Sequence, residues 1–103
     1  KELVIKAKDT DSIVTGRGTG HPCRNVKTKF AKRLANWERD GGTPEGFEEI
    51  TLGSLRKAVV DGNTDEGSML CGLIAGMIND VKPVKEIIDE LSEQAGKLLG
   101  VDF

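Results

Sequence analysis

The sequence predicts a mainly helical domain with one or two short β-strands near its N-terminus, a small α+β fold. Apolar residues recur at intervals of three and four along residues 28–39 and 83–99, the spacing of a helix with one apolar face. A β-branched apolar run beside turn residues at Ser12–Thr15 predicts a strand. The chain shows no repeat or linker, so we treat residues 1–103 as a single small domain with a modest core.

The N-terminal elements are short and leave two alternatives open. Residues 1–8 form an amphipathic piece that fits either the end of a helix or a strand. No capping residue precedes this piece, so we expect the sequence to be an excerpt from a longer protein. After the strand and a glycine-rich loop, residues 23–26 either pair with the strand or lead directly into the next helix.

The two longest predicted helices each have one apolar face and a glycine at their end. The apolar face of the helix at 28–39 is formed by Phe30, Leu34 and Trp37. Glycines follow Asp40 and can end this helix in a left-handed conformation. The helix at 83–99 is expected to lie on the surface with one buried stripe, and Gly100 ends it. The stripe consists of Val84, Ile87, Ile88, Leu91, Ala95 and Leu98.

The segment between these helices is predicted to contain two shorter helical pieces. Thr43 is a typical N-cap, and Pro44 is favoured at the first helical position. Gly53 and Ser54 break or bend the segment before it continues to about Val60. Phe47 and Ile50 are expected to face inward.

Residues 67–79 are almost free of charge and are predicted to form a central helix, capped by the polar residues 64–66. A helix that is apolar nearly all round is buried on several sides. Gly72 and Gly76 lie one helical turn apart and remove bulk from one side. We favour a core helix; the alternative is that the glycine side lines a cofactor or substrate. The apolar run is too short to cross a bilayer, which takes roughly 20 residues.

Charge is divided unevenly along the chain. Residues 1–40 hold ten Lys and Arg against five Asp and Glu, whereas residues 41–103 hold five against twelve, for a net charge of −2. This division fits an anionic partner for the first part or two surfaces that complement each other on folding, and we favour the second. Aromatic residues do not interleave with the basic ones, which argues against a nucleic-acid binder.

Few residues are of the types that form disulfides, bind metals or act as nucleophiles. Cys23 and Cys71 are far apart without CxxC spacing, which favours a reduced, cytoplasmic chain. One histidine, His21, and two distant cysteines are too few for a metal site. Cys71 lies in an apolar run, so its pKa is expected to be raised. The loop from Gly16 to His21 resembles a phosphate cradle only weakly, because it matches neither GxGxxG nor a P-loop.

The residues Asp61–Ile78 (DGNTDEGSMLCGLIAGMI) resemble the C-terminal signature of the nitronate monooxygenase (2-nitropropane dioxygenase) family. The closest branch is the FMN-dependent enoyl-acyl-carrier-protein reductase II, where the pattern runs approximately DGDxxxGSVMAGQIAGLI. Residues 6–15, the GHPxR segment at 20–24 and residues 81–88 are also similar to that family. The resemblance covers nearly the whole chain, in the family's order.

The resemblance implies that this chain is the small helical domain, plus closing C-terminal helix, of a TIM-barrel flavoenzyme. The barrel's phosphate loops and catalytic histidine would lie upstream, so no catalytic residue and no cofactor are expected in the fragment alone. The family segment GSVMAGQ borders the FMN and substrate cleft, and the matching cleft-lining candidates here are Ser68, Leu70, Gly72 and Leu73. Leu70 replaces the family's Met, and Leu73 replaces its Gln, which removes an amide donor.

Two functions therefore remain open. The first is a cleft-covering fragment of an FMN-dependent oxidoreductase that reduces an enoyl thioester with NAD(P)H or oxidises alkyl nitronates. Its partners would be the upstream barrel, an acyl carrier protein or acyl thioester met by Arg17, His21 and Arg24, and a second copy in a homodimer. The second is a self-contained helical interaction domain with a basic face for an acidic partner. A severed barrel domain should expose a large apolar patch, whereas a self-contained domain should not.

Overall fold

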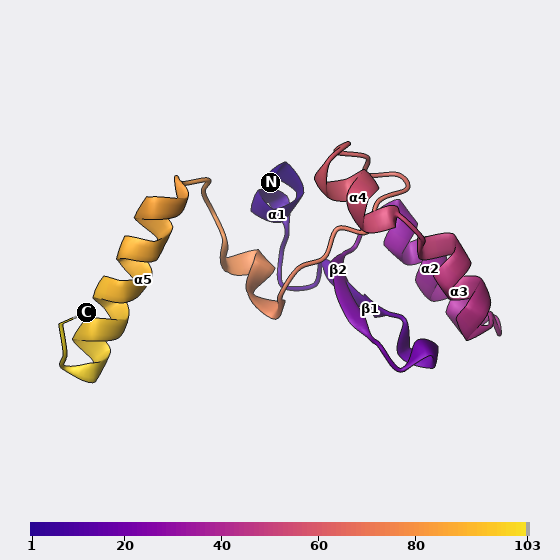
Figure 1. Cartoon of the computed structure of the whole chain (residues 1–103), viewed down its shortest axis with the longest axis horizontal. Helices are drawn as coiled ribbons and strands as arrows, with labels where there is room; N and C mark the ends of the chain where they lie inside the picture. Colours follow the sequence, from indigo (N-terminus) through magenta and orange to yellow (C-terminus); the bar gives the residue numbers. More distant parts are fainter. Residues whose placement is uncertain (103) are drawn as a thin grey trace.

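A computed structural model describes residues 1–102, and its helices and strands follow the predicted fold class (Figure 1). It is mainly helical, with one two-stranded sheet near the N-terminus. In chain order the elements are α1 (Glu2–Lys6), β1 (Ser12–Thr15), the 3₁₀ turn η1 (Arg17–Thr19), β2 (Cys23–Val26), α2 (Lys29–Arg39), α3 (Pro44–Thr51), α4 (Ser54–Val59), the 3₁₀ turn η2 (Leu73–Met77) and α5 (Val84–Leu99). The open alternatives resolve to a helix for the first piece and a strand for the second.

The strands β1 and β2 pair as an antiparallel hairpin in which Thr15 lies opposite Cys23. A third extended segment joins the other edge of β2, because Asn25 forms a bridge with Leu70. Backbone hydrogen bonds on either side of this bridge fix the pairing: Val26 N donates to the Met69 carbonyl at 2.8 Å, and Cys71 N donates to the Arg24 carbonyl at 3.0 Å. Side chains alternate along a strand, so Thr15, Cys23, Asn25 and Leu70 share one face of the sheet.

The core lies where α2 packs against the hairpin. Its buried apolar residues include Val26, Phe30, Ala31 and Leu34, which confirms the predicted inward positions of Phe30 and Leu34. The inward position predicted for Ile50 is wrong, because this side chain is 41% exposed. The Thr28 hydroxyl caps α2 by accepting a hydrogen bond from Ala31 N at 3.1 Å, as Ser and Thr commonly do at this position.

The predicted turn chemistry is also present. Thr43 caps α3 by accepting from Gly46 N at 3.1 Å, and Pro44 occupies the first turn. Gly53 has φ +74°, a left-handed conformation that separates α3 from α4. After α2 the chain turns at Gly41, with φ +96°, and after α5 at Gly100, with φ +68°.

The predicted central helix is wrong. Met69–Cys71 is extended and pairs with β2, and helical structure resumes only as η2. Gly72 is itself extended at φ −90°, ψ 174°, so the apolar run cannot form a continuous helix. Of the residues in η2 only Ala75 is buried. The polar residues at 64–66 accordingly cap no helix. The apolar pattern of residues 67–79 is that of a helix, but residues 69–71 pair with β2 and are therefore extended.

The predicted buried stripe of α5 is wrong as well. The helix has the expected bounds, but among its described residues only Gly96 is buried. Leu91 and Leu98 remain 59% and 88% exposed. Figure 1 shows α5 apart from the other elements, joined through the connection after η2. The stripe is exposed because no element of the described chain lies over it.

The described chain is elongated, at 51 × 26 × 23 Å. Its radius of gyration is 16.6 Å, whereas a compact domain of 100 residues has about 13 Å. The excess follows from the position of α5, visible in Figure 1. No described helix is both long and apolar enough to cross a membrane.

Candidate functional site

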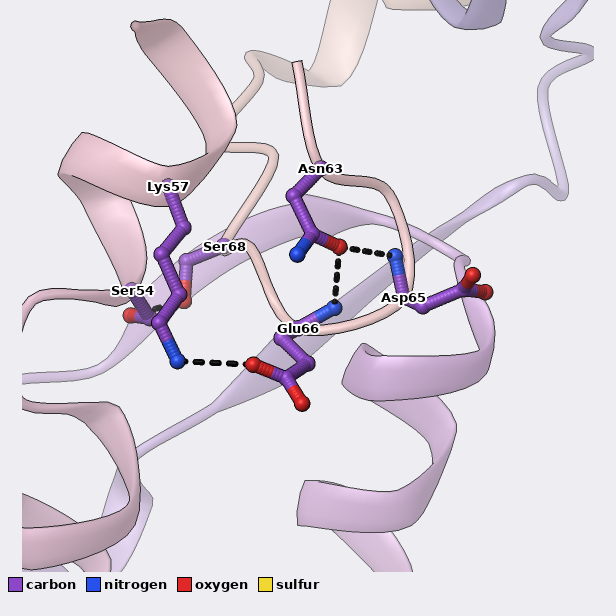
Figure 2. Close-up of polar contacts among 6 residues, drawn as sticks. All are labelled: Ser54, Lys57, Asn63, Asp65, Glu66 and Ser68. Atoms are coloured by element: carbon purple, nitrogen blue, oxygen red, sulfur yellow. Dashed lines mark hydrogen bonds and ion pairs between the residues drawn. The ribbon is translucent and has the colours of Figure 1, made fainter. Parts of the chain in front are cut away.

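The segment Asp61–Ile78, which resembles the family signature, begins with a tight polar turn (Figure 2). The Asn63 side-chain oxygen accepts hydrogen bonds from the backbone N–H groups of Asp65 and Glu66, each at 3.0 Å. Asn63 N in turn donates to the carbonyl of Lys57 in α4, also at 3.0 Å. Asn favours such turns because its side chain can mimic a backbone acceptor. The turn is therefore anchored to α4 at its start.

A surface ion pair between Lys57 and Glu66 links the turn to α4. Lys57 Nζ donates to the Glu66 carboxylate at 2.8 Å, and Figure 2 shows the two side chains meeting beside the turn. The hydrogen bond from Lys57, followed by its charge, lowers the pKa of Glu66. Both side chains are largely exposed, so the pair contributes little to stability.

The turn ends at Ser68, which is hydrogen-bonded to the buried residue Ser54. Its hydroxyl lies 2.7 Å from that of Ser54, and its backbone N donates to the Ser54 carbonyl at 3.1 Å. The preceding Gly67 is buried, and a methyl group there would overlap the backbone of Ala58 and the carbonyl of Asn63. This glycine is therefore required for the close approach of the turn to α4.

The two glycines farther along the segment, Gly72 and Gly76, have different surroundings. A methyl group on Gly76 would lie 2.9 Å from the backbone N of Asp9, so its bare side packs against the chain's own backbone. Gly72 has nothing within 4 Å of the corresponding position and is open. The neighbouring Leu70 and Leu73 are 48% and 75% exposed. Of the four cleft-lining candidates, Ser68 is thus held in place, whereas the other three are exposed. We call Leu70, Gly72 and Leu73 the exposed strip.

The three residues expected to meet a substrate or partner have different surroundings. Arg24 is half-buried and its guanidinium donates to Ser12 Oγ at 2.8 Å. Arg17 is exposed on η1 and lines a cavity of about 370 Å³ with Glu38. His21 is exposed and instead shares a cavity of about 220 Å³ with Ser68 and Leu70. Only His21 therefore joins part of the predicted cleft-lining set.

The glycine-rich loop at residues 16–20 already holds a carboxylate of this chain. The backbone N of Gly16 donates to Glu38 at 2.9 Å, and that of Gly18 donates to its second oxygen at 3.5 Å. These amides are the groups that a phosphate would need, so the loop acts as a structural clamp between the hairpin and α2. Sequence reasoning missed Glu38; its signal is that it is the only acidic residue among residues 28–39.

Both cysteines are free thiols. Burial raises the pKa of Cys71, and the positive charge of Arg24 opposes part of this effect. This direction confirms the expectation from the sequence. A raised pKa leaves less thiolate at neutral pH, so Cys71 is a poor nucleophile.

A buried polar pair on the sheet was not singled out from the sequence. Asn25 and Thr15 are each 3% exposed, and the Asn25 amide nitrogen donates to Thr15 Oγ1 at 3.0 Å. Two short polar residues inside strands are a weak signal, because their burial depends on the helices that cover the sheet. Both residues line the cavity that His21 shares with Ser68 and Leu70.

Comparison with solved structures identifies similar proteins over nearly the whole chain. A structure of FabK from Thermotoga maritima matches with 42% sequence identity and a TM-score of 0.79, covering 97% of this chain and 33% of FabK. A single-substitution mutant of the same FabK matches at 39% identity and a TM-score of 0.68, covering 97% and 30%. This chain thus spans about one third of the length of these relatives.

A comparison with curated proteins finds a more distant relative. It is the (3aS,4S,5R,7aS)-5-hydroxy-7a-methyl-1-oxo-octahydro-1H-indene-4-carboxyl-CoA dehydrogenase of Mycobacterium tuberculosis, 24% identical over 128 aligned positions that cover 88% of this chain and 36% of the relative. No protein-family model matches the sequence. The resemblance found in the sequence is confirmed by the solved structures: the chain is similar in sequence and fold to about one third of FabK, a member of the nitronate monooxygenase and FMN-dependent enoyl-acyl-carrier-protein reductase II family.

Proposed function

We propose that this chain is the small domain and closing helix of an FMN-dependent oxidoreductase of the enoyl-acyl-carrier-protein reductase type, and that it helps to cover the flavin and substrate cleft. The observation that carries the proposal is the 42% identity to FabK over 97% of the chain. Because the match spans one third of FabK, the remaining parts of such an enzyme would come from outside these residues.

The exposed apolar surface of the C-terminal part supports this assignment. Exposed residues there include Leu73, Ile74, Met77, Val84, Leu91 and Leu98. Leaving so much apolar surface in water is unfavourable, at about 25 cal/mol for each Å², and monomeric domains rarely do so. A barrel domain packed on this side would bury it. The self-contained interaction domain, in contrast, leaves this surface unexplained.

The exposed strip formed by Leu70, Gly72 and Leu73 fits one side of a planar ring. Gly72 offers a surface without a side chain, and the exposed leucines that precede and follow it in the sequence supply apolar contact. The strip contains no group for the FMN phosphate, and the loop amides that could bind one are bonded to Glu38. These residues would therefore contact one face of the flavin ring, while the FMN phosphate would be bound by parts of the enzyme outside this chain. When bound, FMN supplies hydride transfer; these residues exclude water and orient the ring.

Among the two reactions considered, the comparisons favour thioester chemistry. FabK is related to the enoyl-thioester reductase branch, and the name of the mycobacterial relative specifies a CoA thioester. The exposed Arg17 and His21 are available to an acyl carrier or a nucleotide phosphate, whereas Arg24 is bonded to Ser12. We therefore propose an enoyl thioester as the substrate and NAD(P)H as the reductant of the full enzyme.

The test compares two open glycines in the natural full-length chain. Gly72→Leu should place a side chain in the proposed ring-facing strip and lower both the FMN retained on purification and thioester-dependent NAD(P)H oxidation by at least about tenfold, the effect of losing about 1.4 kcal/mol of FMN binding free energy. Gly18→Leu is the matched control, because Gly18 is equally open but lies in the hairpin loop. If both variants keep their FMN and activity, the strip does not face the flavin. A full-length chain that retains no flavin would overturn the proposal itself.

A further inference from the structure

The cavity of about 220 Å³ beside His21 is a built polar pocket. It lies on the sheet face that carries Thr15 and Asn25, and residues of α3 and α4 form its other walls. Three of its polar residues, Thr15, Asn25 and Ser54, are at most 4% exposed. Burying polar groups is costly unless their hydrogen-bonding capacity is used, so the partners of each group are informative.

Asn25 is fixed with its amide nitrogen toward the protein. The nitrogen donates to Thr15 Oγ1 at 3.0 Å and to the Cys23 carbonyl at 3.2 Å, and a carbonyl can only accept. The side-chain oxygen of Asn25 receives no hydrogen bond from residues 1–102. Every fully shielded side-chain nitrogen or oxygen in these residues has a partner. The unpartnered oxygen therefore keeps some accessible surface, and Asn25 lines the cavity.

Hydroxyl groups around the cavity have protons to donate. Thr15 accepts from Asn25, so its own proton is available, and no acceptor for it is present among the described residues. Ser54 and Ser68 share a single hydrogen bond in which only one of them donates, so a second hydroxyl proton is available. The cavity thus presents one free acceptor and hydroxyl donors beside the apolar Phe47 and Leu55.

None of the lining residues is Asp, Glu, Lys or Arg, so the walls carry no permanent charge. An ionised ligand group would lose its hydration here without gaining a permanently charged counter-ion, which is costly. A neutral carboxamide fits, because its N–H donates to the Asn25 oxygen and its carbonyl accepts from the Thr15 or serine hydroxyl. We propose that this cavity binds a neutral ligand through a carboxamide group, with its apolar portion against Phe47 and Leu55.

The probe is 4-fluorobenzamide, and its binding to the natural full-length chain is followed by fluorine NMR. The matched control is 4-fluorobenzoate, which has the same shape but carries a charge. The proposal expects saturable binding of the amide and at least tenfold weaker binding of the carboxylate. Equal binding of the two, or no saturable binding of the amide, would overturn it.

Substitutions locate the binding to this cavity. Thr15→Val keeps the shape of the side chain and removes the hydroxyl, and it should weaken amide binding roughly fivefold, the value of about one neutral hydrogen bond. Thr15→Ser restores the hydroxyl and should restore the affinity. Thr64→Val, at an exposed threonine outside the cavity, should have no effect. An unchanged affinity in Thr15→Val, or an equal loss in Thr64→Val, would contradict the assignment.

A second variant keeps the test decisive if Thr15→Val does not fold. Leu70 lines the cavity and is half exposed, so Leu70→Trp adds bulk at the cavity without disturbing the core. It should abolish binding of 4-fluorobenzamide, and undiminished binding would refute the site. The pocket does not rest on the flavin proposal, and the natural full-length chain separates the two. A natural chain that retains FMN but does not bind 4-fluorobenzamide would refute this inference alone, and one that binds the amide but retains no FMN would refute the flavin assignment alone.

Discussion

Residues 12–68 and residues 69–102 of this chain differ in what their apolar and small residues pack against. The first region buries Phe30 and Leu34 between α2 and the hairpin, and Gly67 against α4. In the second region, the described residues that are buried are Ala75 and Gly96. The first region thus has its own core, whereas the second presents a helical apolar stripe with nothing over it. The difference shows that a stripe identifies a buried face only when its partner is part of the same chain segment.

The largest expected contrast between the regions is in leucine truncation. Leu34→Ala should lower the free energy of unfolding of the 103-residue chain by about 3 kcal/mol, because it leaves a cavity in the core. Leu98→Ala removes the same atoms from an 88% exposed side chain and should change it by less than about 0.5 kcal/mol. Urea denaturation measures both values. Equal losses would mean that the second region has a core of its own.

A smaller contrast separates the glycines of the two regions. Gly67→Ala should cost about 2 kcal/mol, because its methyl group would overlap the backbone of α4. Gly72→Ala should be neutral in the same urea experiment, since its surroundings are open and its φ of −90° suits any residue. A destabilising Gly72→Ala would show that this glycine is already packed against the chain.

Within the first region, the Asn63 turn should contribute less than the core. Asn63→Ala removes the acceptor of two backbone hydrogen bonds and should cost about 1 kcal/mol. Asn79→Ala is the control from the second region, because its exposed side chain makes one local bond of 3.3 Å to the Met77 carbonyl. Thermal unfolding of the two variants ranks them, and a larger shift for Asn79→Ala would invalidate the ranking.

The smallest expected effect is the pH dependence of the Lys57–Glu66 pair. The pKa of Glu66 is lowered by the hydrogen bond and charge of Lys57, so the folded state favours the carboxylate. The stabilisation is therefore present above the unfolded pKa of about 4.5 and is lost as pH falls through the lower folded pKa. An NMR titration should show the Glu66 pKa rising in Lys57→Met. A pKa that does not move in this variant would exclude Lys57 as the cause.

Local signals in the sequence predicted much of the first region. The Thr28 and Thr43 caps, the break at Gly53 and the apolar face of α2 follow from chemistry within a few residues of each position. The Asn25–Leu70 pairing could not be predicted in this way, because it joins residues far apart in the chain. The same reason explains the wrong central helix, since 3.6-residue periodicity does not reveal a strand partner.

The candidate site was predictable only in part. The motif resemblance identified the Gly67–Leu73 segment, but it gave no information on which glycine packs inside the chain and which stays open. Only geometry distinguishes Gly76, which lies against Asp9, from the open Gly72. The Glu38 clamp and the buried Asn25 likewise depend on tertiary contacts between separate elements.

We propose that a larger flavoenzyme covers the apolar side of the second region. Hydrogen exchange of the α5 amides, measured in the 103-residue chain and in the natural full-length chain, shows whether this side is covered. We expect the protection of the α5 amides to rise by at least about a hundredfold in the full-length chain, because local opening would then require undocking from the barrel. Equal protection of α5 in the two chains, with α2 protected alike in both, would contradict it.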